Sequence, residues 1–304
     1  MTAAPALFDR QRRLLGLVGA LGGRVGGLDF QKLLFLYCEE DAPPPAPYEF
    51  VPYKFGAFSF TSYSDRRKLI ERGLLANTEH DWQLTPDGEA ALVTLRVAKP
   101  PLTAFARKHD GLRGDALVAD TYRRYPYYAT RSEIAARVLH GDAAALRRIE
   151  ASRPAKASAK LSTIGYEGRS LERYLNKLLG AGVTLLCDVR RNPLSRKYGF
   201  SKGTLSKGCE GVGLRYEHLP ELGIASDERR GLETQADYDA LFARYERESL
   251  PRQTAALVRI EAWLGAGERV ALTCYEELPH QCHRHCVAEA LVRRLGAGVE
   301  ALHL

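Results

Sequence analysis

The chain has 304 residues, 45% of them hydrophobic, and its 44 basic and 37 acidic side chains give a formal net charge of +7. This length suits two domains that each bury a core, and the positive charge favours an anionic partner. Six cysteines in no regular framework argue against a secreted disulfide scaffold, and no apolar run reaches the length of a membrane span. We therefore expect a cytoplasmic protein with reduced thiols and no membrane partner.

The N-terminal region begins with two predicted helices, over residues 7–21 and 28–39. Apolar residues recur at helical spacing in both, and Asp29 is the expected N-cap of the second helix. Cys38 continues the apolar pattern of that helix, which indicates a core position. A stiff proline-rich loop follows at residues 42–47.

The next segment has the layout of a winged helix-turn-helix. A helix is expected around residues 65–72, with a stop at Gly73, a two-stranded excursion through residues 82–84 and a new helix after Pro86. With the two preceding helices, this order predicts a mainly α, winged-helix-like domain. Four basic residues of the third helix would face phosphate if the domain binds DNA, or would be solvated: Arg66, Arg67, Lys68 and Arg72.

The motifs QKLLFLY and PYKFGAFS, followed by a helix that ends in RGLL, resemble the Panacea family of antitoxin-like proteins (DUF4065). The loop at residues 54–59 keeps the family pattern, except that Ala57 stands where the family has proline. The resemblance covers roughly residues 10–135. It implies a module that binds DNA or a protein partner and that carries no chemistry of its own.

A linker is expected between two domains. Residues 103–150 are predicted to be helical, apart from the aromatic run YRRYPYY around Pro126. These tyrosines would either pack into a core at a turn or stack, with the arginines, on unpaired bases. Residues 152–160, SRPAKASAK, are small, polar and basic and have no apolar period, which is typical of a linker. We place one domain at residues 1–151 and the second at residues 161–304.

From residue 161 onward, predicted strands alternate with predicted helices. Strands are expected at 161–164, 183–189, 214–219, 270–273 and 299–302, and helices at 170–179, 237–249 and 251–264. This alternation predicts an α/β domain with a Rossmann-like parallel sheet and crossover helices. No GxGxxG follows the first strand, so a nicotinamide or flavin cofactor is not expected. The glycine- and lysine-rich stretch 199–213 is expected to be a flexible loop suited to phosphate.

Polar residues follow four of these strands, and the carboxyl ends of parallel strands share one edge of a sheet. We therefore expect a cleft there that gathers carboxylates, arginines, a histidine and a thiol. Residues 151–207 hold twelve basic side chains against three acidic ones, which favours contact with phosphate. The residues expected at the cleft are Tyr166, Asp188, Arg190, Arg191, His218, Cys274 and Glu276.

The motifs TIGYEGRS, CDVRRNPLS, LRYEHLPELG and LTCYEELPHQCHR occur in an order that resembles the DUF488 family, a group defined by sequence and without a settled function. The resemblance covers residues 161 to about 300, and His285 and Cys286 lie outside its pattern. The matching positions are Gly165, Tyr166, Asp188, Arg190, Pro193, Ser195, His218, Pro220, Gly223, Cys274, Glu276, Cys282, His283 and Arg284.

The first hypothesis for the cleft is hydrolysis of a nucleotide or of a nucleic-acid base. Asp188 or Glu276 would be the general base or would stabilise a developing cation, and His218 would be an acid or an orienting donor. Tyr166 and Tyr275 would stack on the base or pack within the fold. The residues expected to hold phosphate are Arg190, Arg191, Ser195, Lys202 and Arg284.

Two further hypotheses concern the thiols, and no cofactor besides a metal is expected. Cys274, Cys282, His283 and Cys286 offer soft ligands for zinc or iron, although the spacing differs from common structural zinc sites. Alternatively, Cys274 or Cys282 has a lowered pKa near Arg284 and a helix N-terminus, and is oxidised reversibly. The structural alternative is a pair of inert core thiols.

The sequence therefore predicts a DNA-associated enzyme that acts on a nucleotide or a modified base. Its chemistry would be N-glycosidic or phosphoester hydrolysis, in DNA repair or in defence against foreign DNA. The alternative is a non-catalytic DNA-binding regulator whose cleft senses a small anionic ligand, a metal or an oxidant. For Asp188, a cap or a salt bridge to Arg190 is the structural alternative to a catalytic role.

Overall fold

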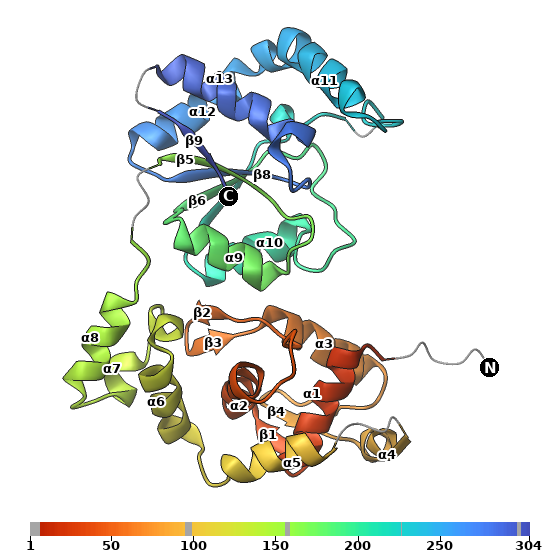
Figure 1. Cartoon of the computed structure of the whole chain (residues 1–304), viewed down its shortest axis with the longest axis vertical. Coiled ribbons are helices and arrows are strands. Elements are labelled where there is room, and N and C mark those ends of the chain that lie inside the picture. The colour runs from red at the N-terminus through yellow and green to blue at the C-terminus, as the bar shows by residue number, and fades with distance from the viewer. Residues whose placement is uncertain (1–6, 95–98, 156–158, 226, 297–298) are drawn as a thin grey trace. The chain divides into compact units, whose positions relative to one another are not determined.

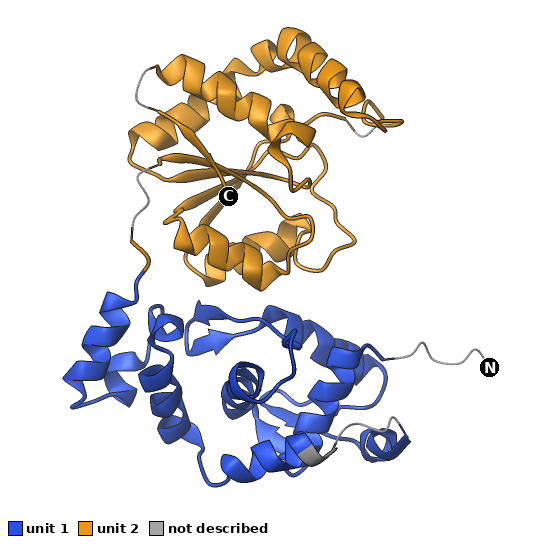
Figure 2. Ribbon diagram, viewed as in Figure 1, with its two compact units in different colours: residues 1–153 blue, residues 154–304 orange. Residues whose placement is uncertain are grey.

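The chain divides into two compact units, Met1–Arg153 and Pro154–Leu304 (Figures 1 and 2). Each unit contains hydrophobic clusters of its own. Within the part of the chain that is described, no helix combines the length and the apolar character needed to cross a bilayer. The computed structural model describes residues 7–94, 99–155, 159–225, 227–296 and 299–304.

The first unit is mainly helical, with two small antiparallel strand pairs. Its helices and strands are α1 (Asp9–Ala20), β1 (Arg24–Gly26), α2 (Gly27–Glu40), β2 (Val51–Tyr53), β3 (Gly56–Phe58), α3 (Phe60–Glu71), β4 (Asp81–Gln83), α4 (Pro86–Thr94), α5 (Lys99–Lys108), α6 (Gly114–Arg124), α7 (Ala135–Val138) and α8 (Ala143–Ala151).

Helix α2 lies at the centre of this unit. Every residue from Phe30 to Cys38 is buried, and a helix that is buried on all sides must be surrounded by other elements. Figure 1 shows α2 nearly end-on, with α1, α3, α5 and α6 around it. The expected core position of Cys38 is therefore confirmed. Asp29, however, is not the N-cap: α2 begins at Gly27, and the Asp29 carboxylate instead accepts a hydrogen bond from the backbone N–H of Gly114 at 2.8 Å.

The strand expected around residue 82 pairs with a distant segment. β4 runs antiparallel to β1, which lies between the first two helices, and Val25 stands opposite Trp82. An isolated bridge joins Leu75 to Leu84, beside this pair. The remaining two strands, β2 and β3, form a separate hairpin within the segment YEFVPYKFGAFSF.

The aromatic run near Pro126 packs within the first unit. Tyr122 is buried, and the rings of Tyr125 and Tyr128 contact the ring of Phe35 edge-on, with centroids 4.9 Å and 4.7 Å away. A short 3-10 helix at Pro126–Ala129 turns the chain there. Of the two alternatives for these tyrosines, the structure supports packing.

The second unit is a five-stranded, all-parallel sheet in the order β7-β6-β8-β5-β9, which confirms the expected parallel α/β architecture. Helices α9 and α10 cover one face and α12 and α13 the other (Figure 1). The elements are β5 (Leu161–Gly165), α9 (Leu171–Gly180), β6 (Leu185–Asp188), α10 (Lys202–Gly211), β7 (Arg215–His218), α11 (Gln235–Arg244), α12 (Thr254–Gly265), β8 (Val270–Cys274), α13 (Arg284–Leu295) and β9 (Ala301–His303).

The stretch 199–213 is not a flexible loop, as expected from its glycines and lysines, but largely the helix α10. Leu205 and Cys209 are four residues apart and both are fully buried, and Val212, just past the helix end, is buried as well. Burial of this apolar stripe against the sheet outweighs the low helix propensity of the glycines. A basic loop that wraps phosphate is therefore absent at this position.

Candidate functional site

A cavity of about 300 Å³ opens where the strands of the parallel sheet end. The loops after β5, β6 and β8 form most of its wall, which is the place where open α/β sheets hold ligands. Four arginines and one carboxylate line it, together with a thiol, an imidazole and two tyrosines. The lining residues are Tyr166, Arg190, Arg191, Asn192, Leu194, Ser195, Arg196, Ile224, Arg229, Cys274, Tyr275, Glu276 and His283.

Asp188 ends β6 behind the cavity wall, with its carboxylate fully engaged. It accepts hydrogen bonds from Nε and Nη2 of Arg190 at 2.8 and 2.5 Å, and from the Tyr216 hydroxyl at 2.7 Å. Burial opposes the charge of Arg190, but the hydrogen bonds and charge of Asp188 prevail and raise the pKa of the guanidinium. Burial and the same carboxylate raise the pKa of Tyr216. Asp188 is thus the anchor of a buried ion pair and is absent from the cavity lining.

Arg190 transmits that anchoring to Tyr166. Its Nη1 donates hydrogen bonds to the Tyr166 hydroxyl at 3.0 Å and to the Phe200 carbonyl at 2.8 Å. The Tyr166 ring stacks on Phe200, with centroids 4.3 Å apart and planes 8° from parallel, and meets Tyr275 edge-on. Tyr166 is therefore held rigidly, whereas Tyr275 keeps 44% of its surface exposed.

His218 and Lys202 lie together, and neither lines the cavity. The Nε2 of His218 is 2.9 Å from the Arg190 carbonyl oxygen, which can only accept, so this nitrogen carries the proton. Its Nδ1 faces the Lys202 ammonium at 3.3 Å. His218 thus supports the backbone of the loop after β6, and both of its ring nitrogens have partners.

The deep end of the cavity holds sulfur and a carboxylate. The Cys274 Sγ is fully buried, 3.5 Å from Oε2 of Glu276 and 3.7 Å from Nδ1 of His283. Glu276 forms an ion pair with Arg229. A hydrogen bond from Cys282 lowers the pKa of the Cys274 thiol to about 7 against the effect of burial, and the charge of Arg229 acts in the same direction. Burial raises the pKa of Cys282.

Arg284, the first residue of α13, does not reach the cavity. Its guanidinium is fully buried and donates to the backbone carbonyls of Glu276 and Glu277, at 2.6 and 2.9 Å. It braces the loop after β8 and leaves no donor directed at a ligand in the cavity. Cys286 is also apart from the cavity: it belongs to the hydrophobic cluster under α13, with its Sγ 3.5 Å from a ring nitrogen of His285.

Two arginines of the lining were not singled out by the sequence. Arg229 and Arg196 come from segments without apolar periodicity, where a charged residue is ordinarily solvated. Only the fold brings them to the cavity. For Arg196 the basic excess of residues 151–207 was a general signal, whereas Arg229 had none.

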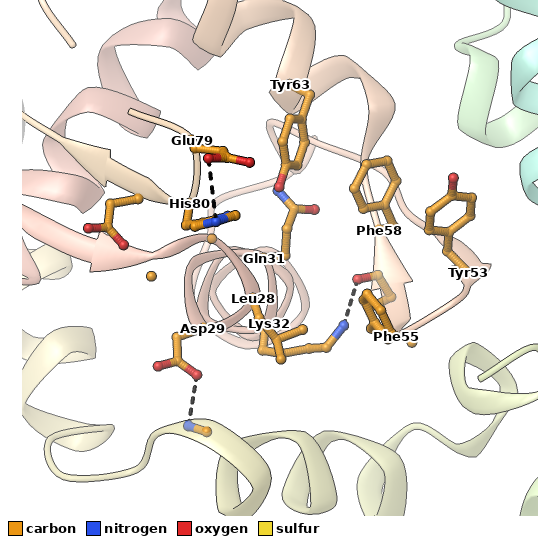
Figure 3. A pocket seen from close by; sticks show the side chains of 16 residues that line it. Leu28, Asp29, Gln31, Lys32, Tyr53, Phe55, Phe58, Tyr63, Glu79 and His80 are labelled. Atoms are coloured by element: carbon orange, nitrogen blue, oxygen red, sulfur yellow. Dashed lines mark hydrogen bonds and ion pairs between the residues drawn. The ribbon is translucent and has the colours of Figure 1, made fainter. Parts of the chain in front are cut away.

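A larger cavity, of about 580 Å³, lies in the first unit beside α2 (Figure 3). Its wall is rich in aromatic side chains, including Tyr53, Phe55, Phe58 and Tyr63. Figure 3 shows the Lys32 side chain extended along this wall, where its Nζ donates to the Ala57 carbonyl at 3.0 Å. Sequence reasoning missed this cavity because Lys32 lies within the otherwise apolar pattern of α2.

Comparison with known families locates a match within the second unit. No curated protein matches the chain. A model of the family described as "Domain of unknown function DUF488" matches residues 170–291, a segment that holds most of the cavity lining and runs from the start of α9 into α13. The expected C-terminal resemblance is thereby confirmed: the second unit carries a DUF488 domain.

Proposed function

We propose that the cavity of the second unit is the active site of a DNA-associated hydrolase that acts on a nucleotide or on a modified nucleic-acid base. One observation carries the proposal: four arginines and one carboxylate line a cavity at the carboxyl edge of a parallel sheet. Phosphate is the anion that such an arginine-rich wall recognises best, since guanidinium groups bind its oxygens in pairs.

The arginines divide into two roles. Arg190 and Arg229 are neutralised by Asp188 and Glu276. Arg191 and Arg196 are exposed, and neither forms an ion pair with a carboxylate in the described part of the chain. The exposed pair therefore supplies the uncompensated positive charge that would hold the phosphate of a substrate.

Glu276 is the general base in this proposal because it is the one carboxylate among the lining residues. It would take a proton from a water molecule as the water oxygen attacks the substrate, and the proton would pass to the departing group. Arg229, its ion-pair partner, is free to move to the negative charge that develops on the substrate. Asp188, bound on both oxygens, is a positioning residue for Arg190 and Tyr166.

The first unit would bring the cavity to DNA. The order of α1, β1, α2, α3 and β4, with β1 paired to β4 and a bridge at Leu75, supports a winged-helix-like module. On α3, Arg66 is used within the fold, since its Nη2 donates to the carbonyls of Thr78 and Asp81. Arg67 and Lys68 are exposed and available to DNA phosphate. The biological setting that fits such a protein is DNA repair or defence against foreign DNA.

The test separates binding from turnover. The full chain is incubated with duplex, single-stranded and modified DNA, and released bases and cleaved strands are identified by mass spectrometry and gel. We expect Glu276→Gln to bind DNA as the wild type does while product formation falls by about 10²–10⁴-fold. The double variant Arg191→Ala/Arg196→Ala should weaken binding and lower the salt dependence of log K by about two.

The control is Arg252→Ala, which removes an exposed arginine outside the cavity. If the double variant behaves like this control, the cavity is not the phosphate site. If the wild type binds DNA with the expected salt dependence but forms no product from any of these substrates, the chain is a DNA-binding regulator whose cavity senses a ligand.

A further inference from the structure

Three soft metal ligands meet at the deep end of the cavity. The Sγ atoms of Cys274 and Cys282 and a ring nitrogen of His283 lie within 4.8 Å of one another. All three side chains are almost completely buried. They come from two places, the end of β8 and the turn before α13, so the fold assembles them and no short sequence motif does.

The hydrogen bonds of His283 leave one nitrogen available to a cation. Its Nε2 is 3.0 Å from the backbone carbonyl oxygen of Val189, which accepts, so Nε2 carries the proton. Nδ1 is then unprotonated, and it points at the Cys274 Sγ. A metal-bound histidine in proteins typically has this arrangement, in which the outer N–H is fixed by a carbonyl and the inner nitrogen is the ligand.

The spacing between sulfur and nitrogen matches a coordinated metal. Zinc–sulfur and zinc–nitrogen bonds at a tetrahedral angle place the two ligand atoms roughly 3.6 Å apart. The observed distance from Cys274 Sγ to His283 Nδ1 is 3.7 Å. Neither ligand would have to move appreciably to take a metal between them.

The charge balance also fits. A divalent cation bound by two thiolates and a neutral imidazole has no net charge, so the nearby guanidinium of Arg284 does not repel it. Arg284 moreover directs its donors to backbone carbonyls of the loop after β8 and not into the ligand cluster. The arginine next to the ligands is thus compatible with a metal.

We propose that Cys274, Cys282 and His283 bind one zinc ion whose fourth coordination position opens into the cavity. Cys274 and His283 both line that cavity, whereas Cys282 lies behind it. Three protein ligands and one open position are typical of catalytic zinc, and closed four-ligand sets are typical of structural zinc. Glu276, whose Oε2 is 3.5 Å from the Cys274 Sγ, stands beside the open position as the base for a zinc-bound water. This role of the fourth position rests on the proposed function, but the zinc site itself does not.

The zinc site is tested on the full chain without any substrate. Elemental analysis of protein purified with zinc should give about one zinc per chain. After removal by a chelator, titration with Co²⁺ should produce sulfur-to-cobalt charge-transfer bands and the visible bands of tetrahedral cobalt, saturating at one equivalent. Cys282→Ser should weaken Co²⁺ binding by more than about 100-fold, because loss of mere outer-shell partners already costs 10- to 100-fold.

Two buried cysteines outside the cluster provide matched controls. Cys286→Ser and Cys209→Ser each remove a buried thiol from the same unit, and both should keep the cobalt bands at full intensity. Circular dichroism shows which variants fold, and the wild-type cobalt titration answers the question even if Cys282→Ser does not. A wild-type titration without sulfur-to-cobalt bands, or bands that persist in folded Cys282→Ser, would overturn the proposal.

The two proposals fail separately. A chain that binds zinc at the cluster but forms no product would overturn the proposed function alone. A chain that forms product at the same rate with and without metal, and shows no cobalt bands, would overturn the zinc site alone.

Discussion

At the scale of single residues, the two carboxylates expected in the cleft have different environments. Asp188 accepts hydrogen bonds from Arg190 and Tyr216 and is fully buried, whereas Glu276 lines the cavity and pairs with Arg229. The sequence could not separate them, because an arginine two residues after Asp188 may either fold back onto the carboxylate or point into a cleft. The choice was made by Tyr216, which approaches from the neighbouring strand β7.

Lys32 is a second residue whose environment only the structure shows. It is 1% exposed, and burial lowers the pKa of its amine from 10.5 to about 7. Its ammonium has a carbonyl partner, that of Ala57, and no ion pair within the described residues. A buried charge without a counter-charge destabilises the folded state, so the folded chain favours the neutral amine.

The free energy of unfolding of the first unit should therefore rise with pH between about 7 and 10.5. In that window the unfolded chain keeps the Lys32 proton and the folded chain does not, so unfolding binds a proton. Relative to Lys32→Met, the wild type should gain up to roughly 1.4 kcal/mol per pH unit across this window, and below pH 7 the difference should be constant and in favour of methionine.

Urea unfolding at several pH values measures this difference. Trp82 lies in the first unit and Trp263 in the second, so a Trp263→Phe background lets fluorescence report the first unit alone. Lys68→Met removes an exposed lysine of α3 and should give a curve parallel to the wild type. Parallel curves for wild type and Lys32→Met would show that the buried amine stays charged.

At the scale of elements, the parallel sheet was predictable and the helix α10 was not. Strands β5, β6 and β8 are continuous apolar runs, because a sheet covered on both faces needs them, and the expected ranges overlap the observed ones. In α10, glycines and lysines concealed an apolar stripe that the sheet buries, as Leu205 and Cys209 show. The shared edge of the strands follows from their parallel direction, but which side chains turn into the cavity depends on hydrogen bonds that only the coordinates contain.

The contact between the loops after β5 and β8 depends on Gly165. The backbone N–H groups of Tyr166 and Glu167 both donate to the Tyr275 carbonyl, at 3.1 and 2.9 Å. A Cβ at position 165 would lie 1.7 Å from the Glu276 carbonyl oxygen, far inside van der Waals contact. Glycine is thus required for the close approach of two backbones that together form one wall of the cavity.

Gly165→Ala should therefore separate these loops and destabilise the second unit by about 3 kcal/mol or more, since backbone cannot yield as a side chain can. Unfolding monitored by Trp263 fluorescence in a Trp82→Phe background measures the change. Gly180→Ala, at the end of α9, places its Cβ in open space and should be neutral or stabilising by up to about 1 kcal/mol. Equal stability of the two variants would contradict the requirement for glycine at position 165.

At the scale of the whole molecule, the candidate active site belongs to one unit. All residues that line its cavity, and all three proposed zinc ligands, lie between residues 166 and 283, within the second unit. The aromatic cavity beside α2 belongs entirely to the first. Binding of DNA by one unit and chemistry in the other would be joined only through the connecting chain, and the two properties should be separable.

Residues 1–153 and 154–304, expressed separately, should each fold and unfold in one cooperative transition. Each has its own core, and a domain of about 150 residues buries roughly 70% of the surface that its unfolded chain exposes. The second fragment should show the cobalt bands of the full chain, because it contains every proposed ligand, and its DNA affinity should be lower than that of the full chain. Circular dichroism, thermal unfolding and the Co²⁺ titration measure these properties. A second fragment that is unfolded, or that binds DNA as tightly as the full chain, would contradict this division of roles.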